Sequence, residues 1–371
     1  MAKGTVLYVG NFELPDKGAS ANRVVSNAKL FNSLGYQTAL LGVSKDTSCT
    51  GIRVLDNDFG IKMYERPYPT STKKWLSHMF SADYIEKMLE YHGDIVLVIL
   101  YNMPFSALKA AKKACKNKNI KIAYDCTEWA DVTDGNAIKR IVKKHDEKLI
   151  RNKLDRAADG MIVISSMMER QYSGKNLLRL PPLVDIDDPI WHQNKIEHSD
   201  IYEFYFAGTI GVKEKVDSIV NAFSKLEADN VRLKIVGITK EEYLSLYPEQ
   251  NGEIDKRIIF MGRMSHKAAI QHLLSTDCYI FIREQTRQNQ AGFPTKFAES
   301  TTCGVPIITT DVSDIKQYME SNVVMLDNAD EANVLSAMKQ ALQIGKQDSA
   351  LNKQFDYHNY LKETDHWLSH I

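Results

Sequence analysis

A lysine and a glutamate three residues apart, Lys296 and Glu299, stand in the part of the sequence with the clearest chemistry. They follow the turn Gly292-Phe293-Pro294, in the first turns of a helix that we predict from Thr295 to about Gly304. Residues at this spacing share one face of a helix. Free amides and a lysine at a helix start favour phosphate, and a carboxylate can accept two hydrogen bonds from a ribose diol. The pattern predicts a nucleotide site containing Thr295, Lys296 and Glu299.

Two arginines precede this helix. Arg283 and Arg287 lie in a polar loop that directly follows the apolar run 278–282, which we predict to be a buried strand. Cations at the carboxyl end of a strand are placed where α/β proteins bind their ligands. Both arginines are therefore candidates for contact with an anionic ligand.

A glycine turn opens the second half of the chain. Gly208 and Gly211 lie between a predicted strand and a predicted helix, and Lys213 and Lys215 follow them. Glycines give a ligand close access to the backbone, and either lysine can reach an anion held there. The alternative is that both lysines are ordinary solvated side chains.

The first half has a similar turn between its first strand and first helix. Gly18 and Ser20 are small residues that let a ligand approach the amides at the helix start, and Arg23 lies on the first helical turn. The GxGxxG spacing of a dinucleotide site is absent. An ordinary loop with a helix cap is the alternative interpretation.

Two carboxylates, Asp125 and Glu128, follow another predicted strand of the first half, at 120–124. On a cleft-facing loop they could orient an acceptor hydroxyl or act as a base, so they are our catalytic candidates. Capping of the next segment explains them equally well. We assign no covalent nucleophile.

The elements that must position these residues alternate along the chain. Short β-rich runs are separated by longer segments of helical period, a pattern typical of parallel sheets covered by helices. In each half a strand, a glycine-bearing turn and a helix come first. We predict two doubly wound domains, with strands at 5–9, 38–42, 95–100, 120–124 and 160–164, then at 202–207, 232–236, 257–261, 278–282, 305–309 and 323–325.

The domain boundary is marked by prolines. The sequence has 371 residues, which is the usual length of two domains. Pro181, Pro182 and Pro189 interrupt both periods, and a new strand series begins soon afterwards. We predict domains at 1–185 and 186–350, and a helical tail at 351–371 with aromatic residues for packing.

The charge is balanced overall but divided along the chain. Lys plus Arg and Asp plus Glu number 47 each, whereas residues 1–185 carry a net +8 and residues 186–371 a net −8. A zero net charge argues against a general polyanion binder and against nucleic acid as partner. The two halves are expected to meet different ligands.

The cysteines and the apolar runs indicate a cytoplasmic protein. Five cysteines without a CxxC pair fit neither a disulfide framework nor a zinc site, and no other metal cluster is evident. No stretch approaches the roughly 18 apolar residues of a membrane-spanning helix. The apolar run at the N-terminus is too short for a signal peptide.

A basic segment at 138–156 carries eight cations and three acids, and its apolar residues keep helical spacing. A solvated face over a buried stripe is the ordinary interpretation. The alternative is a cationic amphipathic helix that holds the protein peripherally on the inner, anionic face of a membrane.

Several motifs together resemble a known family. They are the early glycine loop, the segment Ala158 to Ser166, the Pro-Pro-Leu-Val-Asp linker at 181–185, the turn Ala207 to Gly211, and the segment Gly292 to Ile308. This set is similar to the glycosyltransferases of the GT-B fold, and within them to family 4 (group 1), the large retaining group. The last segment looks like the donor-site signature of that family.

The resemblance implies two Rossmann-like domains facing across a cleft, with the C-terminal helix crossing back to the first domain. A UDP- or GDP-linked sugar would bind the second domain, and a glycan or lipid-linked acceptor the first. Glu299 matches the ribose-binding glutamate, and Lys296, Arg283 and Lys213 would meet the pyrophosphate. No cofactor and no divalent metal are implied. The activity would be hexose transfer in surface polysaccharide or glycoconjugate synthesis.

Two departures from the family pattern leave alternatives open. Ala291 stands where the family has a first acid, and Thr209 where an arginine is frequent. These changes put strict retention of anomeric configuration in doubt. A nucleotide-sugar epimerase of the same fold, or a non-catalytic nucleotide-binding subunit, would also fit the sequence.

Overall fold

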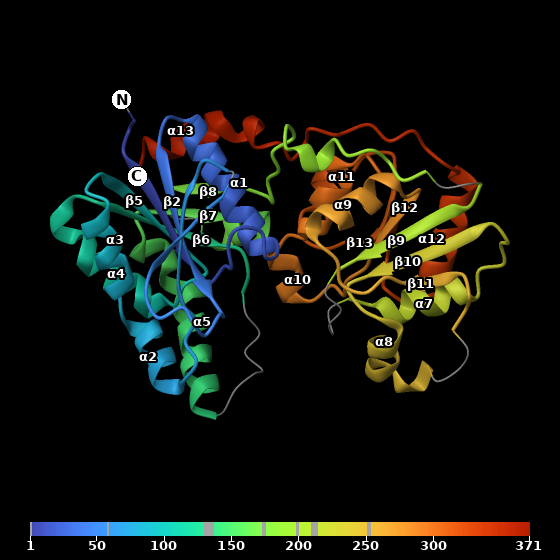
Figure 1. The fold of residues 1–371 in the computed structure, drawn as a ribbon, viewed down its shortest axis with the longest axis horizontal. Helices are drawn as coiled ribbons and strands as arrows, with labels where there is room; N and C mark the ends of the chain where they lie inside the picture. Colours follow the sequence, from blue (N-terminus) through green and yellow to red (C-terminus); the bar gives the residue numbers. More distant parts are fainter. Residues whose placement is uncertain are drawn as a thin grey trace. The chain divides into compact units, whose positions relative to one another are not determined.

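The computed structural model describes residues 2–57, 59–129, 137–172, 176–197, 200–208, 214–250 and 254–371. Two units make up the chain (Figure 1). The first contains Met1–Asp185 and Asp356–Ile371, and the second contains Ile186–Phe355. Each is an α/β unit built around one sheet, so the predicted fold class of two Rossmann-like domains is confirmed.

The sheet of the first unit has the order β3-β4-β2-β1-β5-β6-β7-β8. Its strands pair in parallel except for the antiparallel β3 and β4. Chain order reverses between β1 and β5, which makes that position the switch point of the sheet. The strands are β1 Thr5–Gly10, β2 Gln37–Ser44, β3 Arg53–Leu55, β4 Lys62–Pro67, β5 Ile95–Tyr101, β6 Lys121–Cys126, β7 Gly160–Val163 and β8 Leu177–Arg179.

Among the described residues of this unit, six α-helices precede the linker. The β5 sequence IVLVILY shows why they are needed, because a nearly continuous apolar strand must be covered on both faces of the sheet. The helices are α1 Ala19–Ser33, α2 Thr72–Phe80, α3 Asp83–Tyr91, α4 Phe105–Cys115, α5 Ala137–Ala157 and α6 Ser166–Gln171.

The sheet of the second unit has the order β11-β10-β9-β12-β13-β14 and is parallel throughout. Its strands are β9 Tyr202–Ala207, β10 Val231–Val236, β11 Ile258–Phe260, β12 Cys278–Phe281, β13 Ile307–Thr310 and β14 Val323–Leu326. Its helices are α7 Val216–Ser224, α8 Lys240–Leu246, α9 His266–Ser275, α10 Arg287–Ala291, α11 Thr295–Thr302 and α12 Glu331–Ile344.

The end of the chain returns to the first unit. Helix α13, Leu361–Leu368, contacts β8, and the 3-10 turn Tyr357–Tyr360 before it contacts α1. The Tyr357 amide donates to the Val184 carbonyl at 2.9 Å, and the Trp367 indole donates to the Asn176 carbonyl at 2.8 Å. Trp367 is buried in the core of the unit. The predicted return of the C-terminal helix is confirmed, although the first unit resumes at Asp356.

All six strands expected in the second half are present, and five are found where expected in the first. The prediction missed β3, β4 and β8. Two of these have only three residues, and β4 carries charged side chains that hide its strand pattern: Glu65 and Arg66 are both buried. The five cysteines are free thiols, all buried.

Candidate functional site

Three charged side chains meet beside the carboxyl ends of β9 and β12, two strands that pair with each other. Glu214 accepts a hydrogen bond from Arg283 Nη2 at 3.0 Å, and its carboxylate lies 3.8 Å from Lys296 Nζ. A β-bridge between Glu214 and Arg283 fixes the two backbones. We call these three residues the charged cluster. Its two cations share one carboxylate, which leaves a net positive charge.

Lys296 enters the cluster because Gly208 leaves room for it. A Cβ atom at position 208 would lie 1.8 Å from Lys296 Nζ, so a larger residue there would displace the ammonium group. Two aromatic rings flank the ammonium group, Phe206 at 5.1 Å and Phe281 at 5.8 Å from their centroids. Gly208 therefore does contribute to the site, by giving space to a side chain of the same unit.

The environment of Lys296 disfavours its charged form. Burial and the positive charge of Arg283 lower the pKa of Lys296 to about 8, although Glu214 and Glu299 oppose the shift. An anion placed beside this ammonium group would stabilise the protonated form. Lys296 is therefore suited to bind a diphosphate more strongly than an ordinary surface lysine.

Glu299 follows Lys296 one helical turn later in α11. Its Oε1 lies 2.9 Å from Nε2 of His266, the first residue of α9, and the carboxylate remains 22% exposed. The imidazole orients the carboxylate while leaving part of it open to a ligand. Sequence reasoning missed both His266 and Glu214, and neither lies in a motif that could have revealed it.

The other donor-side candidates are placed less centrally. Thr295 is the first residue of α11, after Pro294. Arg287 is exposed at the start of α10. Lys215 pairs with Glu284 at 2.6 Å. The predicted contacts of Gly211 and Lys213 lie outside the described residues, as does Thr209.

Asp125 does not lie on an open loop, so that expectation is corrected. It belongs to β6, is fully buried, and forms an ion pair with Arg23 at 2.9 Å. Tyr8 donates to the same carboxylate at 2.7 Å. Arg23, expected on the first helical turn near a ligand, is 3% exposed and also donates to the Leu180 carbonyl. The strand that carries Asp125 runs farther than predicted, into the core of the unit.

The remaining candidates of the first unit are accessible. Glu128 is exposed two residues after β6. Gly18 caps the N-terminus of α1 with a φ of 101°, a backbone conformation that favours glycine, and Ser20 lies in the first turn. Glu128 is therefore the carboxylate of the predicted pair that a substrate can reach.

Comparison with known proteins identifies the second unit. A family described as glycosyl transferases group 1 matches residues 187–356. No curated protein matches the chain by sequence. Nearly the whole chain superposes on solved structures of low sequence identity, which are similar in fold.

Three of these structures illustrate the similarity. Sucrose-phosphate synthase from Thermosynechococcus elongatus has a TM-score of 0.71 at 11% identity, covering 99% of this chain and 98% of the other. The catalytic domain of starch synthase IV from Arabidopsis thaliana, bound to ADP and acarbose, has a TM-score of 0.69 at 10% identity, and the match covers 99% of each chain. Anabaena HepE in complex with UDP-glucose has a TM-score of 0.67 at 12% identity, and the match covers 99% of this chain and 100% of the other.

Proposed function

We infer, since residues 187–356 match the glycosyl transferases group 1 family and the chain shares the fold of solved glycosyltransferases, that it transfers a hexose from a nucleoside-diphosphate sugar to a glycan or lipid-linked acceptor. The charged cluster with Glu299 beside it is the observation that carries this proposal. The solved structures with UDP-glucose or ADP support a nucleotide-linked donor. We further propose retention of configuration, family 4 membership and a role in surface polysaccharide synthesis.

The residues of the second unit fit the steps of such a transfer. Lys296 and Arg283 would hold the diphosphate and stabilise the negative charge that develops on it as the sugar leaves. Glu299, oriented by His266, would accept hydrogen bonds from the ribose hydroxyls. In the first unit, Glu128 would orient or deprotonate the acceptor hydroxyl. Because the cations do the electrostatic work, we expect turnover to persist in EDTA.

Turnover with labelled UDP- and GDP-hexoses tests the proposal. With cell-envelope extract as acceptor, we expect label to move into a glycan or lipid fraction. An isomeric sugar formed from donor alone would instead identify an epimerase. Nucleotide binding without turnover, even with the extract, would identify a non-catalytic subunit.

Replacing Glu214 by Gln is expected to strengthen nucleotide binding. The Glu214 carboxylate competes with a diphosphate for Arg283 and Lys296. The amide of the glutamine variant can still accept a hydrogen bond but carries no charge. Removing one like charge next to the ligand should tighten UDP or GDP binding by about threefold to tenfold. Calorimetry measures the change. Glu284→Gln, whose carboxylate pairs with Lys215, serves as the control and should leave affinity unchanged; weaker binding by Glu214→Gln would contradict the prediction.

Nucleotide affinity is expected to fall as the pH rises above 8. Since the pKa of Lys296 is about 8, its cation is present below that pH and is lost above it. Above that pH, Lys296 must take up a proton from solution when the nucleotide binds. The affinity should therefore fall by up to about tenfold per pH unit. Titrations from about pH 7 upward avoid the ionisation of the phosphate itself near pH 6. A Lys296→Ala variant should show a flat profile, and an equally steep one would exclude Lys296 as the cause.

We also propose peripheral membrane association, on the cytoplasmic side, through the first unit. Within the described residues, no helix is long and apolar enough to cross a membrane. Three large apolar side chains of α2 and α5 are exposed: Leu76 by 39%, Phe80 by 59% and Ile141 by 69%. Lys139 of α5 lies over the Trp75 ring of α2 at 5.7 Å, which joins the two helices. Apolar residues among cations fit an anionic lipid surface.

Sedimentation with vesicles containing anionic lipid tests this surface. Ile141→Asp should reduce the bound fraction several-fold, because it removes apolar contact and adds repulsion. The matched control is Leu246→Asp in the second unit, where Leu246 is 56% exposed. Equal loss in both variants, or no binding by the unaltered protein, would remove the proposal.

A further inference from the structure

A cavity of about 200 Å³ lies in the first unit and is lined by residues of that unit alone. Its lining includes Val9 near the end of β1, Arg66 near the end of β4, and Met103 just after β5. These are carboxyl ends of strands, and β1 and β5 flank the switch point of the sheet, where α/β proteins bind ligands. One water needs roughly 10–15 Å³, so the cavity has room for a sugar-sized group.

Arg66 is a buried cation that forms no ion pair with a carboxylate in the described part of the chain. It is 2% exposed, and no described carboxylate lies within ion-pair distance of it; Asp83, which also lines the cavity, is exposed. Its Nη2 donates to Asn11 Oδ1 at 3.3 Å and its Nη1 lies 3.1 Å from His78 Nδ1. Its Nε is buried without an acceptor in the described part of the chain. Burial lowers the pKa of Arg66 to about 10.

His78 adds a second buried donor. Because a guanidinium only donates, Nδ1 of His78 must accept, and the ring proton then lies on Nε2. That Nε2 is also buried and has no acceptor among the described residues. Burial and the charge of Arg66 lower the pKa of His78 to about 4, so the ring is neutral at physiological pH. Arg66 Nε and His78 Nε2 are both donors, and each lacks a hydrogen-bond acceptor among the described residues. A ligand that suits this place would supply acceptor atoms.

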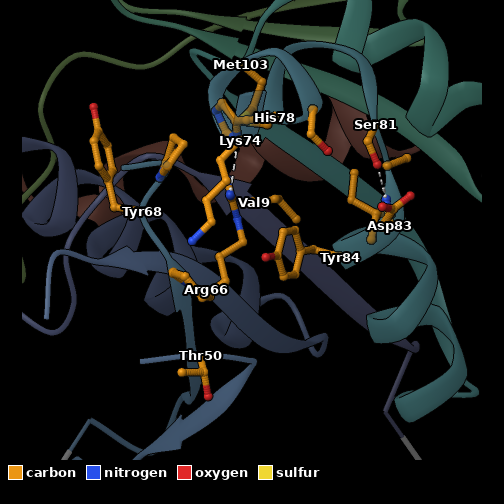
Figure 2. A pocket seen from close by; sticks show the side chains of 15 residues that line it. Val9, Thr50, Arg66, Tyr68, Lys74, His78, Ser81, Asp83, Tyr84 and Met103 are labelled. Carbon is orange, nitrogen blue, oxygen red and sulfur yellow. Dashed lines mark hydrogen bonds between the residues drawn. The ribbon is translucent and has the colours of Figure 1, made fainter. Parts of the chain in front are cut away.

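The rest of the lining suits a negatively charged sugar. Lys74, an exposed residue of α2, brings an accessible ammonium group to the cavity. Figure 2 shows Lys74 and Arg66 among the residues that line the cavity, and the guanidinium centre of Arg66 lies 5.2 Å from the centroid of the Tyr84 ring. Tyr68 supplies a second ring to the lining. Aromatic rings pack against the apolar faces of sugars, and the two cations create a positive potential.

We propose that this cavity binds an oxyanion carried by the acceptor sugar, a carboxylate or a phosphate. Lys74 contacts the oxyanion directly, and the buried charge of Arg66 stabilises it from beneath. The assignment of the sugar to the acceptor rests on the proposed transferase function, whereas the anion site itself does not. A sugar without an anionic group would leave Arg66 uncompensated and should bind poorly.

Calorimetric titration of the full chain with glucuronate, glucose 6-phosphate, glucose and inorganic phosphate tests the site. We expect at least one anionic sugar to bind at least about tenfold more tightly than glucose and than inorganic phosphate. Which of the two anionic sugars binds more tightly distinguishes a carboxylate from a phosphate. Equal binding of glucose, or equal binding of inorganic phosphate, would overturn the proposal.

Two lysines that are neighbours in sequence provide matched variants. Lys74→Gln should weaken binding of the anionic sugar by at least about fivefold, whereas Lys73→Gln, which is exposed and outside the lining, should not. Equal effects of the two would overturn the site. Titration of UDP and GDP into the same samples separates the two proposals. If nucleotide binds but neither anionic sugar does, the proposed anion site in the cavity is refuted and the donor site is not. If an anionic sugar binds but neither nucleotide does, the donor site is refuted and the anion site is not.

Discussion

Lys296→Ala is expected to weaken binding of the donor nucleotide by about tenfold to a hundredfold. The substitution removes a partly buried ammonium group whose hydrogen bonds to phosphate oxygens would be charge-assisted, and such bonds contribute about 1.5–3 kcal/mol each. It also leaves Arg283 paired with Glu214, so that little free positive charge remains for the diphosphate. Calorimetric titration with UDP and GDP measures the loss.

Two further variants control this result. Glu299→Ala should also weaken binding, because the ribose loses its carboxylate acceptor. Lys316→Ala removes a lysine of the same unit that is 63% exposed and paired with Asp311, and it should leave affinity unchanged. Unchanged affinity in both the Lys296 and Glu299 variants would refute the site.

Asp125→Asn is expected to destabilise the first unit by about 3–5 kcal/mol. The variant leaves Arg23, which is 3% exposed, as a buried cation without its charged partner. Tyr8 and Asn27 lie in the same hydrogen-bond network and would lose a charged acceptor. Urea unfolding followed by a probe in the first unit measures the effect, since two units need not unfold together.

The surface pair Lys3 and Asp365 supplies the comparison for Asp125. Both side chains are more than half exposed and their atoms lie 3.4 Å apart, so Asp365→Asn should cost less than about 1 kcal/mol. The double variant Arg23→Met with Asp125→Leu should recover part of the stability lost by Asp125→Asn. If Asp125→Asn were as stable as Asp365→Asn yet lost all turnover, Asp125 would be catalytic after all.

The donor helix could be predicted because its signals are local. Lys296 and Glu299 are three residues apart, and the preceding turn and the closing Gly304 bound the helix in sequence. The strands of the second unit were equally clear, since most are largely apolar and β10, VRLKIV, begins with apolar and charged residues in alternation. Strand β4 was hidden because Arg66 and Glu65 are buried in it, against the usual preference of charged residues for water.

The partners of the candidate residues could not be predicted because they are distant in the chain. Glu214 meets Arg283 across 69 residues, and Arg23 meets Asp125 across 102. Only the pairing of β9 with β12 brings the first pair together, and no sequence spacing encodes it. The same is true of His266 and Glu299, whose contact depends on the packing of α9 near α11.

Titration of the folded 371-residue chain with UDP and GDP tests most directly whether the second unit binds the nucleotide of a sugar donor. We expect at least one of the two nucleotides to bind with one site per chain, and Lys296→Ala and Glu299→Ala each to weaken this binding. If the folded protein bound neither nucleotide, the proposed donor site would be contradicted.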